Sequence, residues 1–296
     1  MPHAESPILL LGAGGFLGQH VAAALRAAGR PVRGVRGTDL AALDAAGWDA
    51  LLAGAGGVVN AAGRTAGGLD ALVRANVQLL AGALDAGARA GVPLVHFASA
   101  AEYGRTPAGH ATRETDPAAP LSVYGASKLA GTVLLQEAVR SGRVRACALR
   151  LTNPLGHGIS AGTLPGRAAQ QLREAAQTGR TDLRFGPLGA ERDFVDARDA
   201  ARAALHVLAL LDTPDSSVPD VINVGSGEAR PVRELVRGLA DLSGYRGPLH
   251  EDAPGSPRSG DVPYQRADLT RLHATGFRAH HPFHASLGAL LGAVPV

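Results

Sequence analysis

Lysine, cysteine and aromatic residues are scarce in this chain of 296 residues. A single cysteine, Cys147, excludes a disulfide within the chain and predicts a reducing, cytoplasmic setting. Aromatic residues make up only 4% and no run of five basic residues occurs, so nucleic-acid binding is not indicated. The histidines show no metal-ligand spacing, and no metal is predicted.

Long apolar runs are also missing. The apolar stretch 8–11 is too short for a membrane span, and residues 1–7 lack the charged segment of a signal peptide. We therefore expect no membrane partner. The 46% hydrophobic content is that of a globular protein, with length enough for one large core or two modest ones.

The scarcity of lysine draws attention to the place of the one that is present. Among the 29 Lys and Arg residues only Lys128 is a lysine, and it lies four residues after Tyr124. This spacing places both side chains on one face of a helix. An ammonium is a compact point charge, unlike a guanidinium, and beside a phenol it favours the phenolate. The pair therefore indicates acid–base chemistry rather than a solvated surface.

Glycines are plentiful where a phosphate site is expected. The apolar stretch 8–11 leads into Gly12-Ala13-Gly14-Gly15-Phe16-Leu17-Gly18, and a helical pattern follows that ends near Gly29. Strand, glycine turn and helix in this order allow a pyrophosphate to approach the backbone at a helix N-terminus.

Further strands are predicted at 32–35, 57–60, 94–98, 144–151 and 221–224, with helices at 69–90, 123–140 and around 198–211. This alternation predicts an α/β fold with a doubly wound parallel sheet. We expect residues 1–156 and about 194–225 to form a dinucleotide-binding domain. Residues 157–193 and 226–296, richer in Gly and Pro, should form a smaller C-terminal substrate-binding lobe.

Together these segments resemble the extended short-chain dehydrogenase/reductase family, also called the NAD-dependent epimerase/dehydratase family, over nearly the whole chain. The resemblance implies a Rossmann fold, with Tyr124 as general acid/base, Lys128 on the nicotinamide ribose and Ser99 on the reacting oxygen; a small residue at a strand end is the alternative for Ser99. The residues that it implies at the cofactor are Gly12, Gly15, Phe16, Leu17, Gly18, Asn60, Ala61, Ala62, Asn76, Ala98, Tyr124, Lys128, Leu151 and Asn153.

Segments 185–199 and 258–263 are similar to those of GDP-mannose dehydratases and, most closely in pattern, GDP-4-keto-6-deoxymannose reductases. The resemblance implies that Arg192 and Arg258 hold a substrate diphosphate, which suits a guanidinium, with Ser99 and Asn153 also at the substrate. Salt bridges at the surface or between lobes are the alternative for the two arginines.

Three departures from the family pattern narrow the function. Position 101, where 4,6-dehydratases carry an acid, is alanine, and Glu102 would point to the other side of an extended segment. Arg36, with Arg33 nearby, occupies the place of the ribose-binding acid and favours a 2′-phosphate, hence NADP over NAD. The chain also appears short by about a strand and a helix between Gly18 and Asn60, so Asp39 and Leu40 are expected at the adenine edge.

The leading interpretation is an NADPH-dependent reductase of a 4-keto sugar nucleotide. A sugar-nucleotide epimerase with retained NAD, a reductase of a non-sugar ketone and a non-catalytic dinucleotide sensor are the alternatives. Helices 69–90 and 123–140 carry apolar positions beyond one stripe. In the family the matching helices form a four-helix bundle between subunits, so a homodimer is expected, with burial in a larger core as the alternative.

Overall fold

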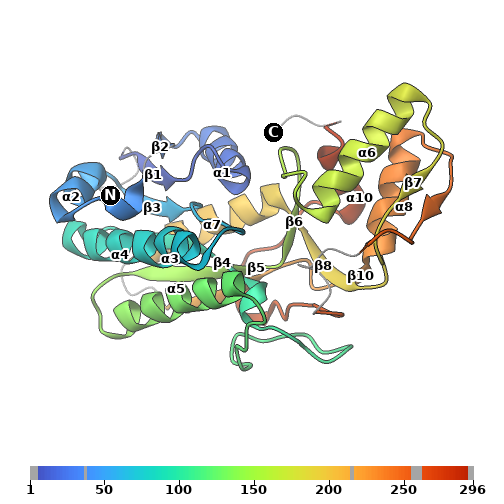
Figure 1. Ribbon diagram of the computed structural model, residues 1–296. Coiled ribbons are helices and arrows are strands. Elements are labelled where there is room, and N and C mark those ends of the chain that lie inside the picture. The colour runs from blue at the N-terminus through green and yellow to red at the C-terminus, as the bar shows by residue number, and fades with distance from the viewer. Residues whose placement is uncertain (1–5, 37–38, 214–216, 255–261, 293–296) are drawn as a thin grey trace.

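A computed structural model of the chain describes residues 6–36, 39–213, 217–254 and 262–292. Its centre is a parallel sheet of six strands in the order β2-β1-β3-β4-β5-β9 (Figure 1). These strands are β1 (Ile8–Leu11), β2 (Val32–Val35), β3 (Gly57–Asn60), β4 (Leu94–Ser99), β5 (Ala146–Leu151) and β9 (Val221–Val224). The doubly wound α/β fold expected from the alternating pattern is confirmed.

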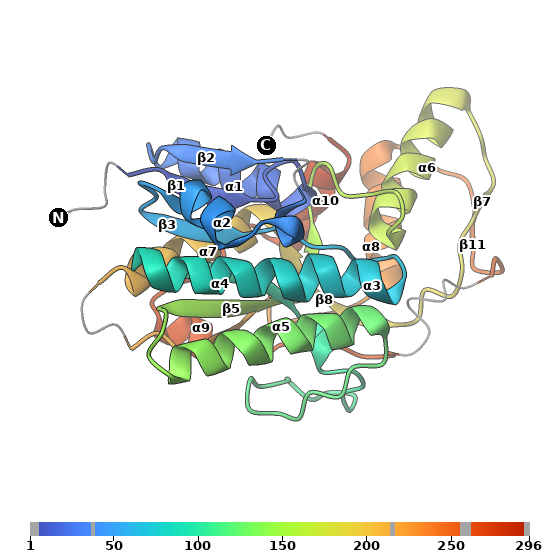
Figure 2. The ribbon, with the colours of Figure 1, turned by 60° about the vertical axis from the view of Figure 1, so that its left-hand side comes forward.

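Helices cover both faces of this sheet and create two hydrophobic clusters. On one face α1 and α7 pack together, and on the other lie α2, α4 and α5, with α4 and α5 side by side in Figure 2. The bounds are α1 (Phe16–Ala27), α2 (Ala45–Leu52), α3 (Leu69–Val73), α4 (Leu79–Ala90), α5 (Val123–Arg140), α7 (Ala197–Leu211) and α9 (Thr270–Ala274), with short 3₁₀ turns η1 (Leu40–Ala42) and η3 (Ala100–Glu102).

The helix expected over residues 69–90 contains a change of helical pitch. A π-helical turn, η2 (Arg74–Gln78), joins α3 to α4. It contains Asn76, which is buried and binds the loop after β3 through its side chain. Single π turns inside helices are frequent at functional sites, and this one lies beside α5 and the loop after β3.

The second part of the molecule, on the right of Figure 1, has its own small core. A three-stranded sheet in the order β10-β8-β6 adjoins a two-stranded sheet β11-β7, and three helices pack on them. The elements are β6 (Asn153–Leu155), α6 (Leu164–Thr178), β7 (Leu183–Arg184), β8 (Glu191–Asp196), β10 (Ala229–Pro231), α8 (Val232–Ser243), β11 (Leu249–His250) and α10 (Phe283–Leu290).

Two segments cross between the two parts. Strand β8 pairs with β6 and β10 in the second part, and α7 begins directly after it on the main sheet. Leu272 lies in α9 and Phe277 follows that helix. Both side chains pack in the first hydrophobic cluster, although the sequence groups 226–296 with the second lobe. The domain boundaries of the sequence analysis therefore stay a prediction, with 267–278 contacting the main sheet.

The short distance between Gly18 and Asn60 has a structural counterpart. Between α1 and β3 the chain forms one strand, one 3₁₀ turn and the short helix α2, so β2 is the edge of the sheet. The six-stranded Rossmann order has a further strand at that position. Within the described residues, no helix is both long and apolar enough to cross a membrane.

Candidate active site

The glycine turn between β1 and α1 is packed so closely that side chains are excluded. Gly12 has φ +78°, and a Cβ there would lie 2.6 Å from the backbone N of Ala62. A Cβ on Gly18 would lie 2.1 Å from the carbonyl O of Gly12. Gly14 and Gly15 are exposed at the start of α1, whose first turn carries no acidic residue and no side-chain cap. The backbone N–H groups of this helix end therefore suit a pyrophosphate.

Two buried asparagines hold the turn after β3 against the glycine loop. The Oδ1 of Asn60 accepts from the N–H of Ala62 at 3.0 Å. Asn76 binds both the N–H and the carbonyl of Arg64 at 2.9 Å, and its Nδ2 also donates to Ser127 Oγ at 2.9 Å. These contacts occupy the amide of Asn76, which therefore shapes this loop, and its predicted contact with the cofactor stays a prediction.

The two arginines predicted near the adenosine ribose have different surroundings. Arg36 follows β2, is exposed, and runs along the glycine turn, with its Cδ 3.6 Å from the position of a Cβ on Gly14. Arg33 instead donates to the carbonyls of Leu51 and Ala53 at the end of α2. Arg33 therefore stabilises a helix C-terminus, and Arg36 is the arginine that faces the phosphate loop.

The adenine edge predicted at Asp39 and Leu40 lies between β2 and α2. Leu40 is buried in the second hydrophobic cluster with Trp48. Asp39 is exposed and forms an ion pair with Arg74 of the π turn at 2.6 Å. The remaining positions predicted at the cofactor lie at or just after the carboxyl ends of β1, β3, β4 and β5. Phe16 and Leu17 are half-buried in the first turn of α1, Ala61 is half-buried, and Ala98 and Leu151 are buried.

Ser99 and Tyr124 meet at the carboxyl end of the sheet. Ser99 ends β4, and Tyr124 lies in the first turn of α5, which Ser122 caps through a hydrogen bond to the N–H of Gly125. The Ser99 side chain lies beside the phenol of Tyr124. Burial raises the pKa of Tyr124, with the Ser99 contact opposing it, so the phenol is held protonated and suits a proton donor.

Lys128 lies one turn further along α5 and is buried, with 5% of its surface exposed. Its Nζ lies 2.5 Å from the carbonyl O of Phe97 and 3.1 Å from Nε2 of His96, both on β4. Burial lowers the pKa of Lys128 to about 8, while the charge of Glu102 acts in the opposite direction. The sequence predicts that Lys128 favours the Tyr124 phenolate. In this structure the largest effect on the pKa of Tyr124 is burial, which favours the protonated phenol.

Glu102 holds the backbone of Ser99 in place through a hydrogen bond. It lies in the 3₁₀ turn after β4 rather than in an extended segment, and is fully buried. Its Oε1 accepts from the N–H of Ser99 and from Thr132 Oγ1, each at 3.0 Å, and its Oε2 accepts from Arg150 Nε at 2.8 Å. A carboxylate with these three partners is fixed in place and is not available as a base.

Asn153 lies where the main sheet passes into the second part. Its Nδ2 donates to the carbonyl of Asp193 at 2.9 Å and to Gln265 Oε1 at 2.6 Å. The buried carboxylate of Asp193 in turn accepts from the N–H groups of Ser226, Gly227 and Ala267. The junction expected around Asn153 is thus held by hydrogen bonds among β6, β8 and the segment 262–267.

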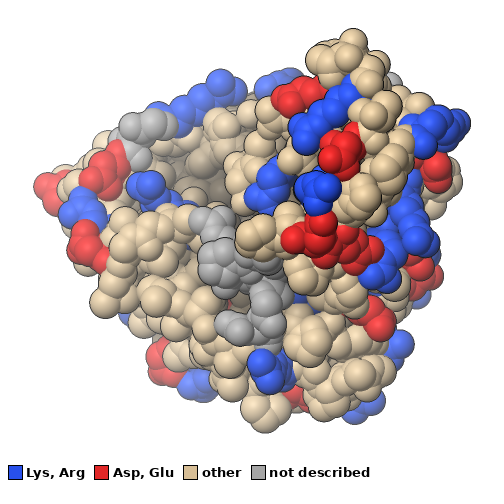
Figure 3. Space-filling model, turned by 45° about the vertical axis from the view of Figure 1, so that its right-hand side comes forward, with Lys and Arg blue, Asp and Glu red and all other residues tan. Residues whose placement is uncertain are grey.

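Of the two arginines predicted at the substrate, the structure describes Arg192 and not Arg258. Arg192 lies on β8 opposite Arg230 of β10, is half-buried, and donates to the carbonyl of Glu191 at 2.8 Å. Burial lowers the pKa of its guanidinium. Arg258 lies outside the described residues, so its part in the site stays a prediction. In Figure 3 the surface is hollowed between the two parts of the molecule, with arginine side chains beside the hollow.

Four side chains shape this site although the sequence did not assign them to it: His96, Asp193 and Gln265, and Glu102, which was expected to point away. Three of them are polar residues placed at buried positions. A polar residue inside an apolar stretch, such as His96 in the strand 94–99, was the available signal.

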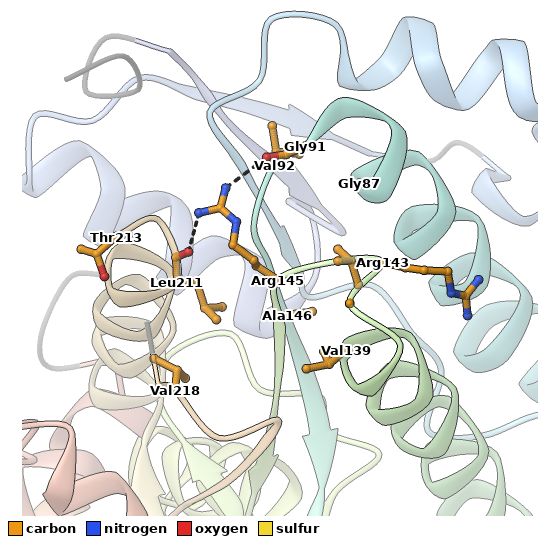
Figure 4. Close-up of a pocket in the computed structure, with 12 residues that line it drawn as sticks. Gly87, Gly91, Val92, Val139, Arg143, Arg145, Ala146, Leu211, Thr213 and Val218 are labelled. Carbon is orange, nitrogen blue, oxygen red and sulfur yellow. Dashed lines mark hydrogen bonds between the residues drawn. The ribbon is translucent and has the colours of Figure 1, made fainter. Parts of the chain in front are cut away.

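A different cavity, of about 460 Å³, lies at the opposite end of the sheet (Figure 4). Arg145 crosses it and donates to the carbonyls of Leu211 and Gly91, at the ends of α7 and α4. Arg145 is thus bound to helix ends, and the cavity lies at the other end of the sheet from Tyr124. We therefore assign this cavity no part in the chemistry at Tyr124.

Residues 8–225 match the NAD dependent epimerase/dehydratase family. The chain belongs to this family. It is therefore an NAD(P)-dependent enzyme of the extended short-chain dehydrogenase/reductase type, with a Rossmann domain, as the order of its motifs implied.

Three relatives of this family member are informative. It is 36% identical to a dTDP-6-deoxy-L-talose 4-dehydrogenase (NAD(P)(+)) of Kitasatospora kifunensis, over 91% of the chain and 89% of the relative. It is 32% identical to an ADP-L-glycero-D-manno-heptose-6-epimerase of Pseudomonas aeruginosa, over 66% of the chain and 63% of the relative. Its fold matches the structure of RMD from Pseudomonas aeruginosa complexed with NADPH, with a TM-score of 0.84, 26% identity, and coverage of 99% and 98% of the two chains.

Proposed function

We propose that this enzyme reduces the 4-keto group of a sugar nucleotide with NADPH. The observation that carries the proposal is the placement of Ser99, at the end of β4, beside the buried phenol of Tyr124 in the first turn of α5. A keto oxygen placed between the two hydroxyl groups would accept a hydrogen bond from Ser99 and a proton from Tyr124. A nicotinamide supplies the hydride when bound.

The residues around the glycine turn fit a dinucleotide. Close approach at Gly12 and Gly18 leaves room for a pyrophosphate at the start of α1, and Arg36 lies beside Gly14. We assign Lys128 to the nicotinamide ribose and Arg36 to a 2′-phosphate. A guanidinium at the end of the second strand favours NADP, where an acid would favour NAD.

The substrate class is argued from the second part of the molecule. Arg192 and Asn153 lie on the neighbouring strands β8 and β6, and Arg258 is proposed as a second contact to the diphosphate. A dehydrogenase acting at position 4 of a dTDP-sugar, as in the Kitasatospora relative, and a 4-keto reductase catalyse one reaction in opposite directions. This relation supports a 4-keto sugar nucleotide as substrate.

Two other reactions of the family are less well supported. Dehydration needs an acid at position 101, which is alanine, and the nearby Glu102 is buried in its ion pair with Arg150. An epimerase with retained NAD is the second candidate, supported by the similarity to the heptose epimerase, and Arg36 argues against it.

The test is an assay with purified protein, NADPH and two substrates, the 4-keto sugar nucleotide formed by oxidising dTDP-6-deoxy-L-talose at position 4, and GDP-4-keto-6-deoxymannose. We expect consumption of NADPH with at least one of them, and loss of about 10²-fold or more in Tyr124→Phe, the usual contribution of a positioned acid. Inversion of a sugar centre with NAD and no net consumption of cofactor would support the epimerase. Absence of any reaction on 4-keto sugar nucleotides would overturn the substrate class.

A further inference from the structure

Among the described residues, His96 is a side chain that contacts Lys128 Nζ and has no part in the chemistry described so far. Its ring is buried on β4, with 1% of its surface exposed. Nδ1 lies 3.1 Å from Nδ2 of Asn60, and Nε2 lies 3.1 Å from Nζ of Lys128. The ring thus connects the turn after β3 to the lysine of α5.

The orientation of the Asn60 amide decides which ring nitrogen carries the proton. Its Oδ1 accepts from the N–H of Ala62 at 3.0 Å, so the NH₂ group faces the histidine. An NH₂ group can only donate, and Nδ1 of His96 must therefore accept. Burial lowers the pKa of His96 well below its usual value, which keeps the ring neutral. A neutral imidazole has one N–H, and it must be on Nε2.

An Nε2–H group can contact Lys128 only as a donor. The partner nitrogen then needs a lone pair, which a neutral amine has and an ammonium lacks. The carbonyl of Phe97 can accept from Nζ in either form, more strongly from the ammonium, so this contact does not require a neutral amine. A protonated lysine would instead place two donors opposite one another at 3.1 Å in a buried site.

We infer that His96 is a positioning residue for Lys128: its Nε2–H donates to Nζ, holds the lysine against β4 as a neutral amine, and releases it on protonation. The proton comes from solvent and is taken up by the Nζ lone pair, while His96 keeps its own. Once charged, the lysine is repelled from His96 and is available to oxygen acceptors such as ribose hydroxyls. Only the contact of the charged lysine with ribose hydroxyls rests on the proposed function.

Other charges around Lys128 do not replace this effect. In the described part of the chain, His96 of β4 contacts Nζ and the charge of Glu102, from the 3₁₀ turn, acts on it, while Tyr124 lies one turn earlier on the same helix. Glu102 favours the charged lysine, but its carboxylate is bound to Arg150 of β5.

The elements on the other side of α5 carry charges with partners of their own. Arg74 of the π turn is paired with Asp39, and on α4 Asp85 and Arg89 are paired with Arg143 and Asp49. Asp70 of α3 is exposed. Within the described part of the chain, Glu102 is the one charge with a resolved effect on Lys128.

The sequence makes a direct measurement possible because Lys128 is its one lysine. Protein labelled with ¹³Cε,¹⁵Nζ-lysine gives a single side-chain signal, whose pH titration reports the charge of Nζ. Without added cofactor we expect a midpoint near 8, the value to which burial lowers the pKa of Lys128. With saturating NADP the midpoint should rise towards about 10.4, so that binding at pH 9 takes up about 0.9 proton.

The variant His96→Gln tests whether the histidine, and not burial alone, keeps Lys128 neutral. A glutamine oxygen can accept a hydrogen bond from an ammonium, which the Nε2–H group of His96 cannot do. Its midpoint without cofactor should rise by about one pH unit or more, equivalent to about 1.4 kcal/mol. His206→Gln is the matched control. That histidine, on α7, contacts Thr275, and its loss should shift the lysine by less than about 0.3 unit.

A second variant keeps the test decisive if His96→Gln does not fold. Asn60→Asp offers a carboxylate to Nδ1, moves the ring proton there, and turns the Nε2 lone pair towards Lys128, so the midpoint should also rise. A wild-type midpoint near about 10.4, or one unchanged in the folded variants, would overturn the inference. Failure of NADP to bind would instead count against the proposed function, and the titration without cofactor would still test His96.

Discussion

At the scale of single residues, Lys128 is enclosed so closely that replacing it with arginine tests shape rather than charge. Its Nζ lies between the Phe97 carbonyl and His96 in a buried site, which has no room for a planar guanidinium. We expect Lys128→Arg to lower kcat/KM by about 10²-fold or more. Steady-state kinetics with whichever 4-keto sugar nucleotide supports consumption of NADPH measure this.

The control for this variant is Arg89→Lys, which changes a basic residue in an exposed ion pair with Asp49. It should leave the kinetics unchanged, since such pairs contribute about 1 kcal/mol or less to stability. If Lys128→Arg kept activity within about threefold, Lys128 would not be the lysine of the acid–base unit.

Arg36 provides a test of cofactor choice. Because its side chain lies along the phosphate loop, Arg36→Ala should weaken NADP binding by about 1–3 kcal/mol and leave NAD binding nearly unchanged. Isothermal titration with both cofactors gives the two affinities. Wild-type protein with equal affinities, or with a preference for NAD, would contradict the assignment and favour the epimerase.

Arg33→Ala is the matched control, three residues earlier and within β2. Since Arg33 binds the carbonyls at the end of α2, its loss should lower thermal stability without changing the ratio of the two affinities.

At the scale of elements, the glycine turn and the start of α1 form one close-packed unit. A Cβ on Gly18 would collide with the Gly12 carbonyl at 2.1 Å, and backbone atoms cannot move aside as a side chain can. We expect Gly18→Ala to destabilise the protein by about 1–3 kcal/mol and to weaken cofactor binding as well. Thermal unfolding with and without NADP measures both effects.

Gly288→Ala on α10 is the control, because nothing lies within 4 Å of a Cβ at that position. Alanine in a helix interior should stabilise the protein by about 0.5–1 kcal/mol. A Gly18→Ala protein as stable as wild type, with the same affinity, would show that the turn opens more easily than its packing indicates.

At the scale of the whole molecule, the hollow between the two parts is where Arg192 is expected to act. If it holds the diphosphate of the substrate, Arg192→Ala should raise KM about tenfold or more, the loss of a charge-assisted contact, with kcat little changed. Arg230→Ala is the control. Arg230 lies opposite Arg192 in the strand pair and is bound to Glu228 and Glu234, so its loss should leave KM unchanged.

Subunit association is predicted through the face formed by α3, α4 and α5 (Figure 2). Large apolar side chains are exposed on or beside these helices, among them Leu69 at 68%, Val123 at 49% and Val133 at 52%. We expect a dimer in light scattering, and a particle of about 30 kDa, one chain, for Val133→Glu. Leu242→Glu on α8, equally exposed, should leave the dimer intact. A wild-type monomer at micromolar concentration would contradict the prediction.

Local patterns were enough to determine much of this protein. Hydrophobic alternation gave the strands 32–35, 57–60 and 221–224 and the helix 123–140 with the bounds that the structure has. Such elements are predictable because burial and helical periodicity act over a few residues. The order of Gly12, Ser99, Tyr124 and Lys128 likewise indicated the family that the comparisons then established.

Tertiary structure alone decided which polar groups meet. Glu102 was expected to point away from the site as part of an extended segment, but the chain turns into a 3₁₀ helix and buries the carboxylate under Ser99. Arg33 and Arg36 look alike in sequence, yet one binds a helix end and the other lines the phosphate loop. His96 gained its role from Asn60 and Lys128, which lie 36 and 32 residues away along the chain. Pairings of this kind depend on how strands and helices pack, so no local pattern records them.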